Sequence, residues 1–140
     1  MAKKKTNELT TFTSSDLSEF IYSPLSDDLA KPFTRQIFLT HVAVAGCNHV
    51  KNIAKYISEM KKGDRVTLLR EPKNPFDELA ILVKDAKNRK LGYVPRAHNH
   101  VIARLMDAGK LIYGVVDRLR GPEDGAFPWK AIVIEIYMED

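Results

Sequence analysis

Two prolines divide the middle of the chain. Pro72 and Pro75 lie between an alternating segment at residues 65–70 and an apolar segment at residues 80–84. Proline lacks a backbone N–H and its ring fixes φ at about −65°, so neither residue fits inside a helix or a central strand. The flanking segments are therefore predicted to be separate strands, joined by a loop of fixed shape at residues 71–77.

Further segments with the composition of β-strands lie on both sides of this loop. They are rich in β-branched residues, partly alternate between apolar and polar side chains, and end at glycine or at polar turns. The predicted strands are residues 37–45, 65–70, 80–84, 91–94, 110–119 and 129–137. Apolar side chains at helical spacing predict short helices at residues 53–60 and 99–108.

The order of these segments predicts the fold class. The strands come in hairpins and only one helical connection is long, which argues against a doubly wound parallel sheet. We expect a mostly β protein, a small antiparallel β-barrel of about six strands with one or two helices. A polar stretch precedes it, so we expect an N-terminal appendage at residues 1–34, partly flexible or a short helix, and one domain at residues 35–140.

Positive charge is concentrated in the centre of the sequence. The chain has 22 Lys+Arg and 18 Asp+Glu, a formal net charge of +4. Residues 51–104 alone contain 13 basic and six acidic residues. A central positive block favours a polyanionic partner. The alternative is that the charges serve only solubility.

Several protein classes are excluded by what the sequence lacks. No apolar run reaches the roughly 18 residues of a membrane-spanning helix. The basic residues 3–5 are not followed by the apolar region of a secretory signal. A single cysteine excludes an internal disulfide framework. We expect a cytoplasmic protein that does not bind membranes.

Catalytic and metal-binding alternatives involve the cysteine and the histidines. Cys47 and His49 are separated by one residue, which places them on one face of a strand as a thiol nucleophile and its base. With His98 and His100 they also supply ligand types that zinc prefers, although the spacing matches no known knuckle. The sequence contains no serine-hydrolase, zinc-protease or phosphate-loop motif. We therefore expect no enzymatic activity, no metal and no cofactor.

Basic and aromatic residues gather at the expected strand ends. Nucleic-acid binding needs positive charge for phosphates and aromatic faces for bases. Phe76, between Pro75 and Asp77 in a loop, is difficult to bury and is the best candidate for an exposed ring. The candidate residues are Arg70, Lys73, Asn74, Phe76, Asp77, Tyr93, Arg96 and Phe127.

Two motifs in this region resemble the HIRAN domain family. The first is Arg-Glu-Pro-x-Asn-Pro-aromatic-Asp-x-x-Ala-Ile at residues 70–81, and the second is Leu-Gly-Tyr-Val-Pro-Arg at residues 91–96. The similarity extends over about residues 36–138. The family occurs at the front of some DNA-repair helicases and as free-standing bacterial proteins, and the chain resembles the free-standing type because it has no helicase motif. The resemblance implies an OB-like β-barrel.

The resemblance also implies a site for the free 3′-hydroxyl end of single-stranded DNA. In that site Asn74, Phe76 and Asp77 hold the terminal nucleotide. Phe76 stacks on a base, and Asp77 accepts a hydrogen bond from the 3′-hydroxyl while it repels an internal phosphate. Tyr93 and Arg96 belong to the second motif, in which Arg96 contacts phosphate.

Three further residues are placed by the same resemblance. Phe127 lies where another stacking aromatic is expected. Asn48 and His49 stand where the end-binding members carry an Arg-Tyr pair. Asn48 donates a hydrogen bond without a charge, and His49 stacks less strongly than tyrosine.

We predict a nucleic-acid-binding module for single-stranded DNA and its 3′ end, linked to DNA repair or replication. One alternative is a protein–protein adaptor that recruits a helicase or nuclease through Phe20, Ile21 and Tyr22. A second alternative is a metal-dependent hydrolase. The dependence of affinity on salt distinguishes the DNA-binding module from the adaptor. For binding through phosphates, the logarithm of the affinity falls with the logarithm of the salt concentration, with a slope of about −0.7 per phosphate contacted, whereas the affinity of an apolar contact hardly responds.

Overall fold

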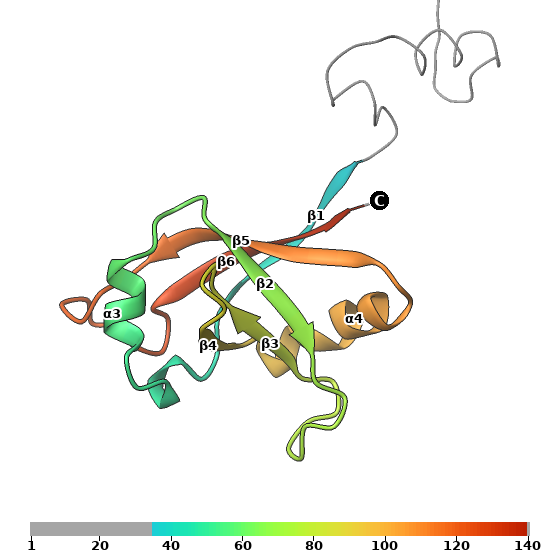
Figure 1. Cartoon of the computed structure of the whole chain (residues 1–140), viewed down its shortest axis with the longest axis horizontal. Helices are drawn as coiled ribbons and strands as arrows, with labels where there is room; N and C mark the ends of the chain where they lie inside the picture. The colour runs from blue at the N-terminus through green and yellow to red at the C-terminus, as the bar shows by residue number, and fades with distance from the viewer. Residues whose placement is uncertain (1–34, 140) are drawn as a thin grey trace, which may run out of the picture. The chain divides into compact units, whose positions relative to one another are not determined.

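The computed structural model describes residues 35–139, which form one six-stranded antiparallel sheet and three short helices (Figure 1). The strands are β1 (Gln36–Ala43), β2 (Arg65–Arg70), β3 (Ile81–Lys84), β4 (Lys90–Tyr93), β5 (Leu111–Leu119) and β6 (Ile132–Glu139). The helices are the 3-10 helix η1 (Cys47–His49) and the α-helices α3 (Ile53–Ser58) and α4 (Arg96–Asp107). The prediction of a mostly β protein with about six strands and two α-helices is confirmed.

The predicted appendage at residues 1–34 lies outside the described residues, as do Phe20, Ile21 and Tyr22 of the adaptor alternative. The division of the chain into residues 1–34 and 35–140 therefore stays a prediction. None of the helices that the structure describes is long and apolar enough to cross a membrane.

The sheet has the strand order β1-β6-β5-β2-β3-β4 and is not closed into a barrel. Within residues 35–139, the outer strands β1 and β4 form no ladder with each other. Just beyond β1, Ala45 and Tyr93 exchange two backbone hydrogen bonds with N···O distances of 2.7 and 2.8 Å. At the next residue, Gly46, φ is 81° and the chain turns into η1, which ends this pairing after one bridge. The predicted barrel is thus not confirmed.

The core lies on one face of the sheet and follows the alternation of the strands. Val66 and Leu68 of β2 are buried while their neighbours Arg65, Thr67 and Leu69 are exposed. On β6 the alternate residues Ile132, Ile134 and Ile136 form a fully buried apolar face. Burying each of these large apolar side chains contributes about 1.5–3 kcal/mol. Helices α3 and α4, at opposite ends of the sheet, complete the core (Figure 1).

The largest differences from the predicted element boundaries are at the start of α4 and the start of β6. Helix α4 begins at Arg96, three residues before the predicted start. Its N-cap is Pro95, whose carbonyl oxygen accepts a hydrogen bond from the backbone N–H of His98 at 2.9 Å. Strand β6 begins at Ile132 rather than at residue 129. The preceding residues form a turn that Arg120 holds by donating from Nη1 to the carbonyl oxygen of Lys130 at 2.6 Å.

The hairpin of β3 and β4, which carries part of the site, is organised by a buried carboxylate. Asp85 Oδ1 accepts hydrogen bonds from the backbone N–H groups of Lys87 and Arg89 at 3.0 and 2.8 Å. Its Oδ2 accepts from Arg89 Nε at 2.8 Å. The predicted turn between these strands is therefore confirmed, and its polar residues satisfy an otherwise buried charge.

Gly92 permits the close approach of β4 to the segment after β1. A Cβ atom at this position would lie 2.2 Å from the backbone oxygen of Ala45 and 2.7 Å from Cγ1 of Val44. Its φ of +152° is also unfavourable for other residues. A side chain here must therefore push the two segments apart.

We expect Gly92→Ala to lower the free energy of unfolding by about 2–4 kcal/mol, because overpacking and backbone strain add. Urea denaturation measures the change. Gly125→Ala is the matched control, since a Cβ there meets no atom within 4 Å. Equal stability losses in the two variants would contradict the close contact.

Candidate functional site

The loop between β2 and β3 is fixed by one amide side chain. Asn74 Oδ1 accepts hydrogen bonds from the backbone N–H groups of Phe76 and Asp77 at 2.8 and 3.2 Å. Asn74 Nδ2 donates to Glu71 Oε1 at 3.0 Å. Asparagine stabilises turns in this way because its short side chain replaces a backbone partner. The two prolines and Asn74 together give the loop the fixed shape that the sequence predicts.

Phe76 lies on this loop with its ring in solvent. Its exposed fraction is 83%, so the prediction of an exposed ring is confirmed. Its backbone is nevertheless held, because Arg96 Nη2 donates to the carbonyl oxygen of Phe76 at 2.9 Å. The molecule therefore presents a large apolar ring on a well-anchored backbone.

Asp77 is held by three groups of the protein. Its Oδ1 accepts from the backbone N–H of Leu79 at 2.9 Å, and its Oδ2 accepts from Nδ2 of the buried Asn99 at 2.8 Å. Arg96 Nε lies 3.7 Å from the same Oδ2. The hydrogen bond from Leu79, followed by that from Asn99, lowers the pKa of Asp77 below its usual value. This carboxylate is therefore ionised at neutral pH, and both of its oxygens have a protein partner.

A second carboxylate, Glu71, is paired with Tyr93 across the hairpin. Tyr93 Oη donates to Glu71 Oε1 at 2.8 Å. The hydrogen bond from Asn74 is the main cause that lowers the pKa of Glu71. Burial, and then the hydrogen bond to Glu71, raises the pKa of Tyr93. Glu71 was not among the predicted site residues, although its place between arginine and proline in the first motif was the available signal.

These groups surround a hollow of about 1110 Å³. The predicted residues that line it are His49, Lys73, Asn74, Phe76, Asp77, Tyr93 and Arg96. Lys90, which was not predicted, also lines it, and its Nζ lies 4.8 Å from the centre of the Tyr93 ring. The lining therefore combines four basic side chains with aromatic and proline rings and two carboxylates.

Arg70 is not part of this lining, because its guanidinium group bonds within the protein. Nη1 and Nη2 donate to the carbonyl oxygens of Ala80 and Glu78 at 2.8 and 3.0 Å. Nε donates to Asp107 Oδ1 at 2.9 Å, and the Arg70 side chain is only 13% exposed. The structure thus places Arg70 as a brace between the base of the loop and the end of α4.

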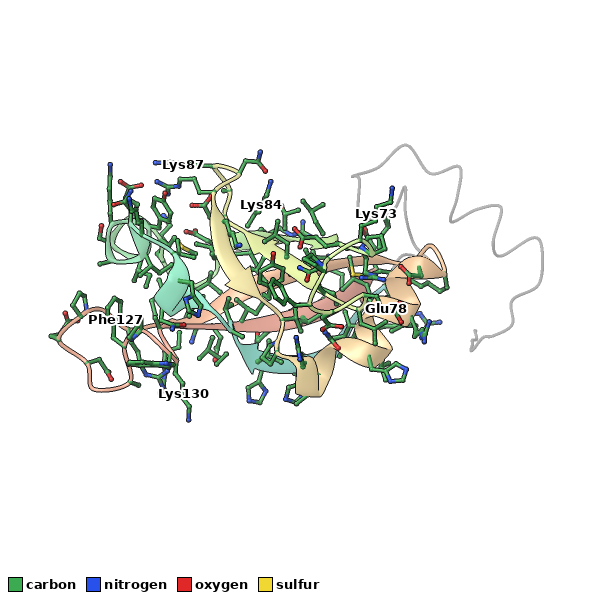
Figure 2. The ribbon with its side chains drawn as sticks, turned by 90° about the horizontal axis from the view of Figure 1, so that it is seen from below. Lys73, Glu78, Lys84, Lys87, Phe127 and Lys130 are labelled. Atoms are coloured by element: carbon green, nitrogen blue, oxygen red, sulfur yellow. The ribbon has the colours of Figure 1, made fainter. Side chains whose placement is uncertain are left out.

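Asn48 and Phe127 also lie outside the lining. Asn48 is exposed next to the hollow, with Nδ2 3.4 Å from His49 Nε2. Phe127 is partly buried against the core in the connection between β5 and β6. Figure 2 shows Phe127 and Lys73 toward opposite ends of the described domain. The structure does not bring Phe127 to the hollow.

The residues of the catalytic and metal alternatives differ in burial: the cysteine is buried and the three histidines are exposed. Cys47 is buried and its Sγ donates to the carbonyl oxygen of Val44 at 3.5 Å, whereas His49 is exposed. Burial raises the pKa of the Cys47 thiol to about 11. Within residues 35–139, no three His, Cys, Asp or Glu side chains are grouped as a metal ion would require. His98 and His100 lie exposed on α4.

Comparison with known proteins gives one family and a set of similar folds. The model of the HIRAN domain matches residues 37–139. A crystal structure of a protein from Lactobacillus plantarum is 29% identical with a TM-score of 0.68, covering 76% of this chain and 98% of that chain. The crystal structure of the HIRAN domain of human HLTF is 21% identical with a TM-score of 0.53, covering 76% and 74%. No curated protein matches the chain.

We expect the folded protein to react with a thiol reagent such as iodoacetamide roughly 100-fold more slowly at pH 8 than the urea-unfolded chain. A pKa raised by about two units lowers the thiolate fraction by that factor, and burial slows the reaction further. Because Cys47 is the single cysteine, mass spectrometry follows the reaction directly. A folded protein that reacts as fast as the unfolded one would restore the nucleophile alternative.

Proposed function

This chain belongs to the HIRAN domain family, and we propose that it is a nucleic-acid-binding module that holds single-stranded DNA at its 3′-hydroxyl end in the hollow beside the loop. The observation that carries the proposal is the exposed ring of Phe76 on a fixed loop. Aromatic side chains of this kind stack on nucleobases, with about 1–3 kcal/mol per base. Because the backbone is held before binding, little conformational entropy is lost when a base stacks.

The positive charges of the hollow favour a single strand whose phosphates lie near these basic side chains, which we call the basic rim. Lys73, Lys90 and Arg96 line the hollow and offer positive charge to phosphate groups. Lys84 projects to the same side as Lys73 (Figure 2). The two carboxylates, in contrast, bond to protein groups beside the loop. This arrangement favours phosphates at the basic rim and a base against the aromatic and carboxylate groups.

Asp77 is the proposed acceptor for the terminal hydroxyl. A carboxylate offers about four lone pairs, so each oxygen retains capacity beyond its bond to Leu79 or Asn99. A 3′-hydroxyl donates to such an oxygen. A 3′-phosphate brings a second negative charge against it and is disfavoured.

Other parts of the proposal rest on the family resemblance. We infer that the module has an OB-like architecture and acts in DNA repair or replication in the cytoplasm, without catalysis of its own. The same resemblance favours a helicase or nuclease as its partner. It provides the DNA-end contact in such a pairing, and the partner provides the chemistry.

We expect Phe76→Ala to weaken binding of a short single strand roughly 5- to 150-fold, which corresponds to a stacking loss of about 1–3 kcal/mol. Fluorescence anisotropy measures the change, and thermal unfolding should be the same as for the parent protein because the ring is exposed. Val101→Ala is the matched control, since Val101 is 66% exposed on α4 and lies outside the hollow.

The same assay separates the modes of binding. Strands that end in a 3′-hydroxyl should bind more tightly than strands that end in a 3′-phosphate, and Asp77→Ala should remove this difference. The logarithm of the affinity should also fall with the logarithm of the salt concentration, with a slope of about −0.7 per phosphate contacted. Unchanged binding by Phe76→Ala, or binding that is insensitive to salt, would show that the hollow is not the DNA site.

A further inference from the structure

Glu71 lines the hollow, and only one of its two carboxylate oxygens is used in hydrogen bonds with the described residues. Its Oε1 accepts from Asn74 Nδ2 at 3.0 Å and from Tyr93 Oη at 2.8 Å. Among residues 35–139, no group donates a hydrogen bond to Oε2, and no lysine, arginine or histidine side chain forms an ion pair with it. Asp77, the other acid of the lining, has a partner on each oxygen. Glu71 is therefore the acid of the lining that has a whole oxygen available to a ligand.

The two bonds to Oε1 also fix where Oε2 is. Asn74 belongs to the locked loop, and Tyr93 is held on β4 by its backbone hydrogen bonds to Ala45. A carboxylate held from two elements cannot turn freely, so its second oxygen has a defined position. A ligand group in the hollow thus meets a fixed acceptor.

The charge of this acceptor restricts which part of a nucleotide can face it. The pKa of Glu71 lies below its usual value, so the group is an anion at neutral pH. A phosphate oxygen would be repelled and has Lys73, Lys90 and Arg96 close by instead. A group that lies against Glu71 must therefore be uncharged and must donate a hydrogen bond. Two parts of a nucleotide meet both conditions, the terminal hydroxyl and the edge of the base. Because the proposed function assigns the hydroxyl to Asp77, the base edge is the part left for Glu71.

We propose that Glu71 selects the base that enters the hollow, favouring bases with an exocyclic amino group over thymine or uracil. The inference rests on the proposed function. Carboxylates accept hydrogen bonds from the amino group of cytosine, and adenine and guanine offer the same kind of donor. Thymine has a carbonyl oxygen where cytosine has this amino group. Facing Glu71, that oxygen would meet a negative charge, and Oε2 would lose its hydrogen bond.

The test compares single strands of about six nucleotides made only of cytosine or only of thymine, a length within the usual site size of such modules. Anisotropy titrations give the affinity for each strand, and their ratio is the readout. The parent protein should bind the cytosine strand roughly 5- to 100-fold more tightly, the usual range for one base-specific contact. The ratio cancels changes in general attraction to phosphates.

Glu71→Gln tests the residue itself. Asn74 and Tyr93 both donate to Oε1, so the glutamine keeps its oxygen there and places its amide NH2 where Oε2 was. A donor replaces an acceptor, and the cytosine preference should be lost or reversed toward thymine. Glu78→Gln is the matched control. Glu78, labelled in Figure 2, is on the loop between β2 and β3 and is exposed. It is not among the residues that line the hollow. This variant removes the same charge and should leave the ratio unchanged.

The outcomes separate the inference from the proposed function. Equal binding of the two strands by the parent protein, or the same ratio in Glu71→Gln and Glu78→Gln, overturns the role of Glu71 and leaves the DNA module intact. Failure of the parent protein to bind either strand overturns both. The parent ratio does not depend on any variant, so a Glu71→Gln protein that misfolds does not rescue the inference.

Discussion

The close contact between the backbone at Gly92 and that of Ala45 is the constraint on which the site depends. It brings β4 against the segment that follows β1. In the strand order of the sheet, β1 and β4 are the two outer strands. The bridge between Ala45 and Tyr93 then places η1, with His49, beside the strand that carries Tyr93 and Lys90. With the loop after β2 these elements enclose one hollow. A larger residue at position 92 would separate its walls.

Hydrogen bonds between residues close in sequence shape the loop of this hollow, and hydrogen bonds between distant residues join the loop to the rest of the domain. Asn74 organises the loop through groups within three residues of itself, so the loop shape is largely local. Distant contacts join the loop to the domain: Arg70 reaches Asp107, and Asp77 reaches Asn99. Each oxygen of Asp77 already accepts one internal hydrogen bond, and Oε1 of Glu71 accepts two. The basic side chains of Lys73 and Lys90 line the hollow.

Features that depend on residues close in sequence were predicted from the sequence, and features that depend on long-range contacts were not. Residues 65–70 alternate, and the prolines fix the loop, so β2 and the shape of the loop are predictable from neighbouring residues. Arg70 was predicted to face DNA because its motif does not reveal Asp107, which lies 37 residues later and comes near only through folding. Phe127 was predicted from its place near a strand end and from the family resemblance, yet it lies in the connection between β5 and β6 and does not line the hollow. The open sheet order likewise depends on a turn at Gly46 that local periodicity does not report.

The anchored loop has a consequence for the rates of binding. A hollow whose walls are formed beforehand needs no rearrangement, so encounter and orientation alone limit association. If the proposed function holds, the basic side chains of the hollow would set how fast a strand arrives, and the ring of Phe76 would set how long it stays. Variation at the lysines would change arrival times, and variation at the ring would change residence times. One small domain can in this way tune the two rates through different residues.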